Sequence, residues 1–204
     1  MMLPLIVFLV AVIIPVFFSK TRSAPLWLAL QALALGWNGV THHEAISIHS
    51  FMALLEVLVV RAAIAPLLLR RAIHRRAEPN LDLMPSNLFT WLIAIVLIVL
   101  AFNFGSPVMT DRQALTLGVI GATVAVALLL LSTNNSPPAQ LAAVLFMENA
   151  LALFESLLPE PWPLPVHGAL SGIYLLTVGV GCWLIGAPDS TAIAVESPGA
   201  EHHA

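Results

Sequence analysis

Residues 138–158 read PAQLAAVLFMENALALFESLL, a largely apolar run with the carboxylate of Glu148 at its midpoint and a second carboxylate, Glu155, near its end. About 20 mostly apolar residues are enough for a helix to cross the hydrocarbon core of a bilayer. A carboxylate at that depth costs roughly 2.5–3.5 kcal/mol on insertion scales, and such residues usually face a bundle interior or a water-filled path. We therefore expect a membrane helix that carries a proton-handling group at Glu148.

The whole chain has the composition of a membrane protein. Of its 204 residues, 59% are hydrophobic and only 9% are charged, whereas a soluble domain carries about 25% charged residues. These values predict an all-α, polytopic bundle of about seven transmembrane helices, each satisfying its own backbone in lipid. The expected spans are approximately 3–18, 25–41, 50–69, 87–104, 113–132, 138–158 and 164–187.

Basic residues indicate how the bundle is oriented. Lys20 and Arg22 follow the first span, and a second basic group, Arg70, Arg71, Arg75 and Arg76, follows the third. The positive-inside rule places both connections in the cytoplasm. We expect a multi-pass protein of the cell inner membrane, with its N-terminus outside and a disordered, polar tail at 188–204 inside.

Two carboxylates on the sixth span suggest a path for ions. Glu148 and Glu155 are seven residues apart, so on an α-helix they point the same way, about 10.5 Å apart along the axis. A central and a peripheral carboxylate on one face indicate a proton route. The alternative is that Glu155 lies at the membrane interface and that Glu148 is a neutral, hydrogen-bonded packing residue.

The third span carries Glu56 and Arg61 near its middle. Five residues correspond to about 140° around an α-helix, so we expect no simple same-face pair and a separate partner for each. A fixed cation at a variable distance from a buried carboxylate changes its affinity for protons, which is the role expected of Arg61. The alternative is a structural ion pair between helices. Pro66 predicts a local kink.

Motifs for other chemistry are absent from the sequence. It has no phosphate-binding glycine loop, no CxxC and no nucleophile elbow, and the group His42, His43, Glu44 and His49 fits no zinc spacing. We expect no catalytic centre, no metal, no cofactor and no nucleic-acid partner.

Two motifs resemble the hydrogenase-4 component E family, membrane subunits of formate hydrogenlyase-type and other group 4 hydrogenase-like complexes. They are RAAIAPLLLRR at 61–71 and MEN at 147–149. The last helices of that family are similar to the K subunit of respiratory complex I. The resemblance implies family-specific helices in 1–112, a K-like three-helix part in 113–187, and the tail in 188–204.

The resemblance also implies partners and roles. The partners are antiporter-like and other membrane subunits together with a peripheral redox arm, and Glu148 is the central protonatable site. The chain departs from the family in having Arg61 where lysine is usual, and Gly172 where the last helix has an acidic residue. Glu155 or Glu56 is the candidate substitute for that acid. His167 and Tyr174 are candidates for holding water.

These features favour a subunit of a complex I-like or group 4 hydrogenase-like complex that contributes to proton or Na⁺ translocation. One alternative is a structural or assembly subunit of the same membrane arm, with no ion path of its own. A stand-alone ion transporter is the other, although the two halves show no inverted repeat and no pair of interrupted helices.

Overall fold

The computed structural model describes residues 2–42, 48–75, 82–84, 87–103, 109–158 and 162–186. Within these ranges the chain is helical and has no strand. The predicted tail at 188–204, most of the histidine-containing connection, and Arg76 of the basic connection lie outside the described residues.

Seven helical rods run through the described part of the chain, which confirms the predicted all-α fold and the number of helices. The third rod is continuous and changes its winding twice. In chain order the elements are α1 (Leu3–Phe18), α2 (Ala24–His42), the third rod of α3 (Ile48–Glu56), η2 (Val57–Ile64) and α4 (Ala65–Arg75), then α5 (Leu88–Asn103), α6 (Asp111–Thr133), α7 (Pro137–Phe154) and α8 (Leu164–Gly186).

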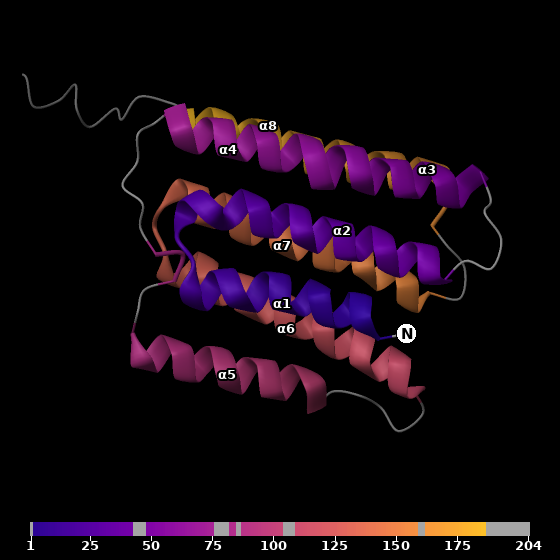
Figure 1. Cartoon of the computed structure of the whole chain (residues 1–204), viewed down its shortest axis with the longest axis horizontal. Helices are drawn as coiled ribbons and strands as arrows, with labels where there is room; N and C mark the ends of the chain where they lie inside the picture. Colours follow the sequence, from indigo (N-terminus) through magenta and orange to yellow (C-terminus); the bar gives the residue numbers. More distant parts are fainter. Residues whose placement is uncertain are drawn as a thin grey trace, which may run out of the picture.

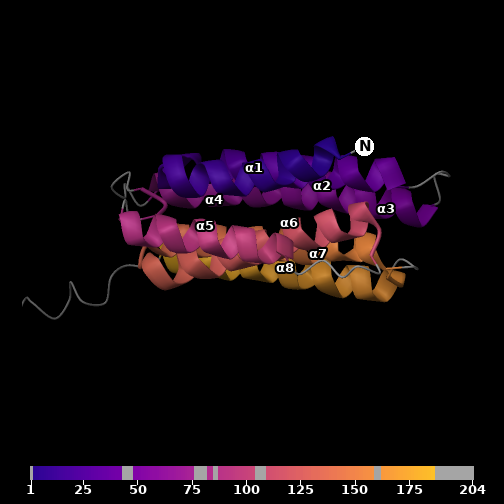
Figure 2. The ribbon, with the colours of Figure 1, turned by 90° about the horizontal axis from the view of Figure 1, so that it is seen from below.

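The helices form two layers (Figures 1 and 2). The third rod, α2 and α1 lie side by side in one layer, and α8, α7 and α6 lie in the other. Across the layers α4 contacts α8, α2 contacts α7, and α1 contacts α6, while α5 packs on α6 at one edge. The centre of the bundle is therefore the α2–α7 contact, with the third rod and α8 beside it.

Among the described residues, four helices are long and apolar enough to cross a membrane. They cover Ser50–Arg75, Asp111–Thr133, Pro137–Leu157 and Pro165–Gly186. Leu3–Phe18 and Leu88–Asn103 are apolar but have 16 residues each. Large apolar side chains cover the outer surface, among them Leu88, Phe18 and Trp183. Such an extended apolar exterior is typical of a surface that faces lipid or other membrane chains.

The sixth rod ends differently from the prediction. We expected a helix through residue 158, but α7 ends at Phe154 and a 3-10 turn, η3 (Glu155–Leu157), follows it. Leu158 is extended, with φ −77° and ψ 143°. A residue before proline is driven out of the α region, and Pro159 is next in the chain. Glu155 therefore lies beyond the last α-helical turn.

Two glycines allow neighbouring helices to approach closely. A Cβ added at Gly181 of α8 would lie 2.5 Å from a methyl carbon of Leu141 in α7. A Cβ added at Gly118 of α6 would lie 2.4 Å from the ring of Phe102 in α5. Small residues at such crossings bring membrane helices into van der Waals contact along their backbones.

Candidate functional site

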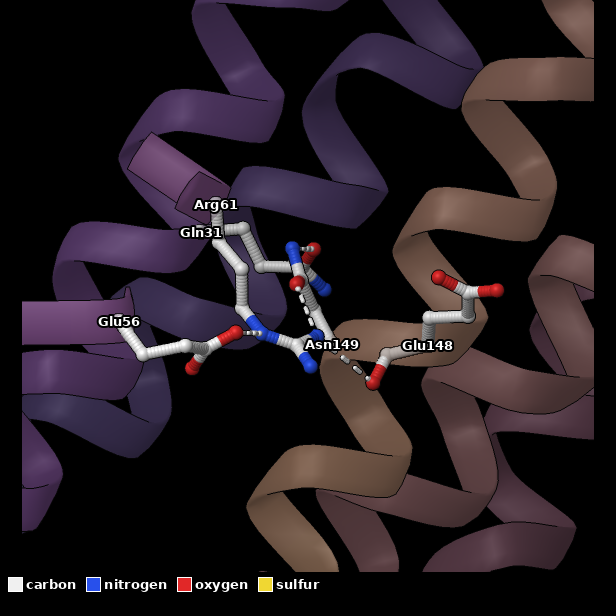
Figure 3. A network of polar contacts seen from close by, with 5 residues as sticks. All are labelled: Gln31, Glu56, Arg61, Glu148 and Asn149. Carbon is white, nitrogen blue, oxygen red and sulfur yellow. Dashed lines mark hydrogen bonds and ion pairs between the residues drawn. The ribbon is translucent and has the colours of Figure 1, made fainter. Parts of the chain in front are cut away.

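Arg61 lies buried where the third rod meets α7 and α8, with 5% of its surface exposed. Its Nε donates to Oε1 of Glu56 at 3.0 Å. Its Nη1 donates to Oδ1 of Asn149 at 3.2 Å and to the backbone carbonyl of Glu148 at 3.3 Å (Figure 3). Its Cζ lies 4.3 Å from the ring centroid of Tyr174, within the range of a cation–π contact. The permanent cation is thus stabilised by an anion, two dipoles and an aromatic face.

The Glu56–Arg61 ion pair shows that the expected separation of these two side chains was wrong. That expectation assumed 3.6 residues per turn, whereas η2 (Val57–Ile64) is a π-helix. Backbone bonds in a π-helix join residues five apart, so residues five apart lie about one turn from each other. Glu56 and Arg61 therefore share a face and pair within one rod, and Arg61 also takes the expected partners on neighbouring helices.

Pro66 supplies a local reason for the π-helical winding. Proline has no N–H to donate, and its ring clashes with the carbonyl four residues earlier in an α-helix. A wider turn before Pro66 relieves that clash. The last π-helical backbone hydrogen bond runs from the N–H of Ala65 to the carbonyl of Val60, five residues earlier. The kink expected at Pro66 takes the form of a change of winding.

Asn149 extends the network into α2. Its Nδ2 donates to Oε1 of Gln31 at 2.9 Å, and both residues are fully buried. Arg61 has only donors, so the atom of Asn149 that it contacts must be the oxygen. Arg61 thereby fixes the orientation of both amides, and one polar chain links the third rod, α7 and α2 (Figure 3).

The carboxylate of Glu148 points away from the chain of polar contacts that joins Arg61, Asn149 and Gln31 (Figure 3). Its Oε1 lies 2.9 Å from the hydroxyl of Thr177 in α8. Its Oε2 is buried and has no hydrogen-bond partner among the described residues. The Thr177 hydroxyl also lies 3.0 Å from the carbonyl of Ile173. The Thr177 hydroxyl has one proton and can donate to only one of these two acceptors at a time. If Glu148 is protonated, it can donate to the Thr177 oxygen, and the Thr177 hydroxyl can then donate to the carbonyl of Ile173.

Glu155 and His167 form a separate pair at the end of α7. Oε1 of Glu155 lies 2.8 Å from Nε2 of His167 in α8 and accepts the backbone N–H of Trp162 at 3.0 Å. These bonds join the end of α7 to the start of α8. Both carboxylates of the sixth rod thus bond to α8, Glu148 at its middle and Glu155 near its beginning.

The structure brings together some of the residues singled out in the sequence and separates others. Glu56, Arg61, Tyr174 and the backbone of Glu148 meet in one cluster, whereas Glu155 and His167 meet elsewhere. Tyr174 contributes its ring to Arg61, and its buried hydroxyl has no partner among the described residues.

Comparison with protein-family models, curated proteins and solved structures gave no match. What the chain does is therefore argued from its own geometry.

Sequence reasoning missed two members of the site, Gln31 and Thr177, and considered Asn149 only as part of a motif. Gln31 is an amide within the long apolar stretch of α2, which was the available signal. Thr177 gave none, because a hydroxyl in a membrane helix commonly bonds to its own backbone. The position matched to the missing acid, Gly172, is exposed, and no atom lies within 4 Å of a Cβ placed there.

A hollow between α5 and α6 lies apart from this cluster. It is lined by Leu97, Leu100, Ala101, Leu117, Gly121 and Ala125. These side chains offer no polar group, so the hollow provides no chemistry. The candidate site is the polar cluster around Arg61 and Glu148.

Proposed function

We propose that this chain is a subunit of the membrane arm of a complex I-like or group 4 hydrogenase-like complex, and that Glu148 carries the translocated proton or Na⁺. The observation that carries the proposal is the setting of the Glu148 carboxylate. It lies mid-helix in an apolar bundle, and among the described residues it has one hydroxyl partner, no cation in contact and an unpaired second oxygen. A permanently charged carboxylate there would be far more costly than a neutral acid that charges transiently.

Arg61 supplies the second element of this mechanism. Its guanidinium bonds to the backbone of Glu148 while the acid side chain turns toward Thr177. Rotation of the Glu148 side chain changes the separation of acid and cation. With the carboxyl group beside Thr177 the neutral acid is favoured, and near Arg61 the ionised form is stabilised. The ion is therefore held in one rotamer and released in the other.

The proposed setting is the cell inner membrane, with the N-terminus outside and residues 188–204 in the cytoplasm. The basic connections after the first and third rods support this orientation. The proposed partners are antiporter-like membrane subunits and a peripheral redox arm. Support for them comes from the resemblance of 61–71 and 147–149 to the hydrogenase-4 component E family, and from the K-like layout of 113–187.

The partners are tested by purifying the tagged chain from its native membrane in mild detergent. Mass spectrometry of the complex that co-migrates should identify antiporter-like subunits and subunits that carry metal clusters. A chain that migrates alone, or only with copies of itself, would contradict the redox-complex proposal and favour a stand-alone transporter.

The role of Glu148 is tested by Glu148→Gln in the assembled complex, with Asp111→Asn as the matched acid-to-amide control at the start of α6. Proton uptake by membrane vesicles should fall strongly relative to redox turnover for Glu148→Gln and stay unchanged for the control. The composition of the complex should be the same for both. Undiminished proton uptake in a complex that contains Glu148→Gln would refute the role of this acid.

The Arg61 cluster favours one alternative, an assembly subunit without an ion path. Buried polar bonds between three rods would then serve only to fix helix packing. This reading requires that Glu148→Gln and Arg61→Lys reduce the amount of assembled complex and leave its turnover and coupling intact. The proposed function requires that Glu148→Gln spare assembly and change coupling.

A further inference from the structure

Two buried amides on α2 each have a polar atom without a partner. Gln31 is 0% exposed and Asn38 is 2% exposed. Nε2 of Gln31 and Oδ1 of Asn38 have no hydrogen-bond partner among the described residues. They are seven residues apart in one helix, hence on nearly the same face and about 10.5 Å apart along the axis.

The unpaired atom of Gln31 is necessarily a donor. Arg61 donates to the side-chain oxygen of Asn149, so the Asn149 amide nitrogen donates to the side-chain oxygen of Gln31. The NH₂ group of Gln31 therefore faces away from this chain of bonds. A buried donor and a buried acceptor at opposite ends of one stretch of helix are the kind of groups that enclosed water satisfies.

α7 repeats the pattern of α2. On α2 the order is Gln31, Leu35, Asn38, and along α7 and the η3 turn that follows it the order is Asn149, Leu153, Ser156, with the same spacing of four and three residues. The two helices lie side by side and run in the same direction (Figure 1), and the Gln31–Asn149 bond sets their register. Two leucines at one level therefore separate an amide pair from an outer polar pair.

The leucines belong to a distinct part of the core. Leu153 is fully buried and Leu35 nearly so, and both belong to one cluster with Leu5 and Phe8. On the other side of the amide pair, Leu28 and Leu145 belong to a second cluster. The Gln31–Asn149 pair thus lies between two apolar layers, and beyond the Leu35–Leu153 layer lie the buried Asn38 near the end of α2 and the half-buried Ser156 in η3.

We propose that water occupies the Asn38–Ser156 level and that Leu35 and Leu153 form an apolar gate between it and the Gln31–Asn149–Arg61–Glu148 cluster. The water at the outer level donates to Oδ1 of Asn38 and to the free lone pairs of Ser156. When the leucines part, about three waters in file span the distance from Asn38 to Gln31. Constrictions lined by such side chains block passage by excluding water.

The ligand in this proposal is water, and its use as a route for protons rests on the proposed function of Glu148. The path gives the cluster access to one end of the bundle, where α2 and α7 end. Under the proposed orientation that end faces the outside of the cell. Rotation of Glu148 and opening of the leucine layer are then separate steps.

The water is tested first on the unmodified protein by brief X-ray radiolysis, which generates hydroxyl radicals from bound water. Oxidation is read residue by residue by mass spectrometry. Leu35 and Leu153 should be oxidised several-fold faster than Leu28 and Leu145, the buried leucines of the same helices beyond the amide pair. Equal rates for the four residues would overturn the proposal.

Thiol labelling gives a second measurement in membranes. In a Cys182→Ala background, Asn38→Cys should react with a small, charged thiosulfonate several-fold faster than Ala32→Cys, which is equally buried on another face of α2. An unreactive Asn38→Cys in a chain that assembles normally would contradict the outer water site.

The gate is tested with Leu35→Ala against Leu28→Ala, two identical truncations of buried leucines in α2. Leu35→Ala should raise the labelling of Glu148 by a water-soluble carbodiimide several-fold, and Leu28→Ala should leave it unchanged. The same labelling in both variants would rule out the gate.

These outcomes are independent of turnover and separate the two proposals. Rapid oxidation of Leu35 and Leu153 together with normal proton uptake by Glu148→Gln would keep the water site and remove the role of Glu148. Loss of proton uptake by Glu148→Gln together with slow oxidation of both leucines would do the reverse.

Discussion

Arg61 donates to the backbone carbonyl of Glu148 at 3.3 Å, while the carboxylate of Glu148 bonds to Thr177 on α8. Arg61 thus hydrogen-bonds to Glu148 through the main chain, while the carboxyl group takes its hydrogen bond from α8. Variants at Arg61 and at Thr177 therefore probe different halves of the site, which makes the following predictions separable.

Replacing Arg61 by Met should destabilise the bundle. The change removes three hydrogen bonds, donated by Nε and Nη1, and leaves Glu56, whose side chain is 19% exposed, without its cation. Removing one partner of a buried ion pair costs about 3 kcal/mol, which corresponds to a fall of about 6–12 °C in Tm for a chain of this size. Thermal unfolding in detergent measures the difference. Arg71→Met, an exposed arginine on α4, should leave Tm unchanged; equal shifts for both would contradict the packing role.

Pro66 should control the pairing of Glu56 with Arg61. With alanine at 66 the backbone N–H returns and an α-helical winding becomes available, which places the two side chains about 140° apart. A double-mutant cycle of Glu56→Gln and Arg61→Met should give a coupling energy of about 1–3 kcal/mol in the natural chain. In the Pro66→Ala background the coupling should fall below about 0.5 kcal/mol. An undiminished coupling would show that tertiary contacts alone hold the π-helix.

Thr177→Val should act on Glu148 without touching Arg61. The change keeps the shape of the side chain and removes the one hydrogen bond that the described residues make to the carboxyl group, at a cost of about 1–2 kcal/mol. Thr123→Val is the control, because the bond that this buried hydroxyl makes within the described chain goes to the carbonyl of Val119 in its own helix. Chemical unfolding should rank Thr177→Val clearly below Thr123→Val. Identical stabilities would show that the Thr177–Glu148 bond contributes nothing.

Glu155→Gln distinguishes a role of Glu155 in proton transfer from a structural role in the α7–α8 connection. Glutamine keeps the oxygen that accepts the N–H of Trp162, so the α7–α8 connection should stay formed and Tm should change little. If Glu155 substitutes for the acid missing at Gly172, proton uptake by vesicles should slow, since an amide carries no proton at neutral pH. Unchanged uptake would remove Glu155 from the ion path and leave it the structural role that its bonds with His167 and Trp162 describe.

Gly181→Ala should loosen the contact between α7 and α8. The added methyl group would lie 2.5 Å from Leu141, which is buried and cannot move aside freely. Overpacking of this kind costs about 1–3 kcal/mol. Gly179→Ala, two residues earlier on the same helix, meets no atom within 4 Å and should be neutral. Comparable losses in the two variants would indicate a helix-wide effect in place of the local clash.

Hydropathy predicted the helices well because span length and composition are properties of the chain itself. The predicted span 3–18 coincides with α1, and 113–132 lies within α6 (Asp111–Thr133). The capping box of Thr110 and Gln113 fixes the start of α6 through local bonds alone. Two helix ends were predicted wrongly. The third rod continues to Arg75 beyond the predicted end at residue 69, and α7 gives way at Glu155 to a 3-10 turn that apolar content does not reveal.

The sequence by itself determined the seven helices of the described chain, the place of Glu148 within an apolar run and the need to accommodate Arg61, because burial preference and helix length are summed over local residues. Only the tertiary structure decided which atoms meet. The π-helical winding paired Glu56 with Arg61, and the contact of α2 with α7 joined Gln31 to Asn149. The packing of α8 against α7 brought Thr177 within hydrogen-bond distance of Glu148, and His167 within hydrogen-bond distance of Glu155. Hydrogen bonds are short and directional, so they depend on helix register and rotation, which arise only when the helices pack together.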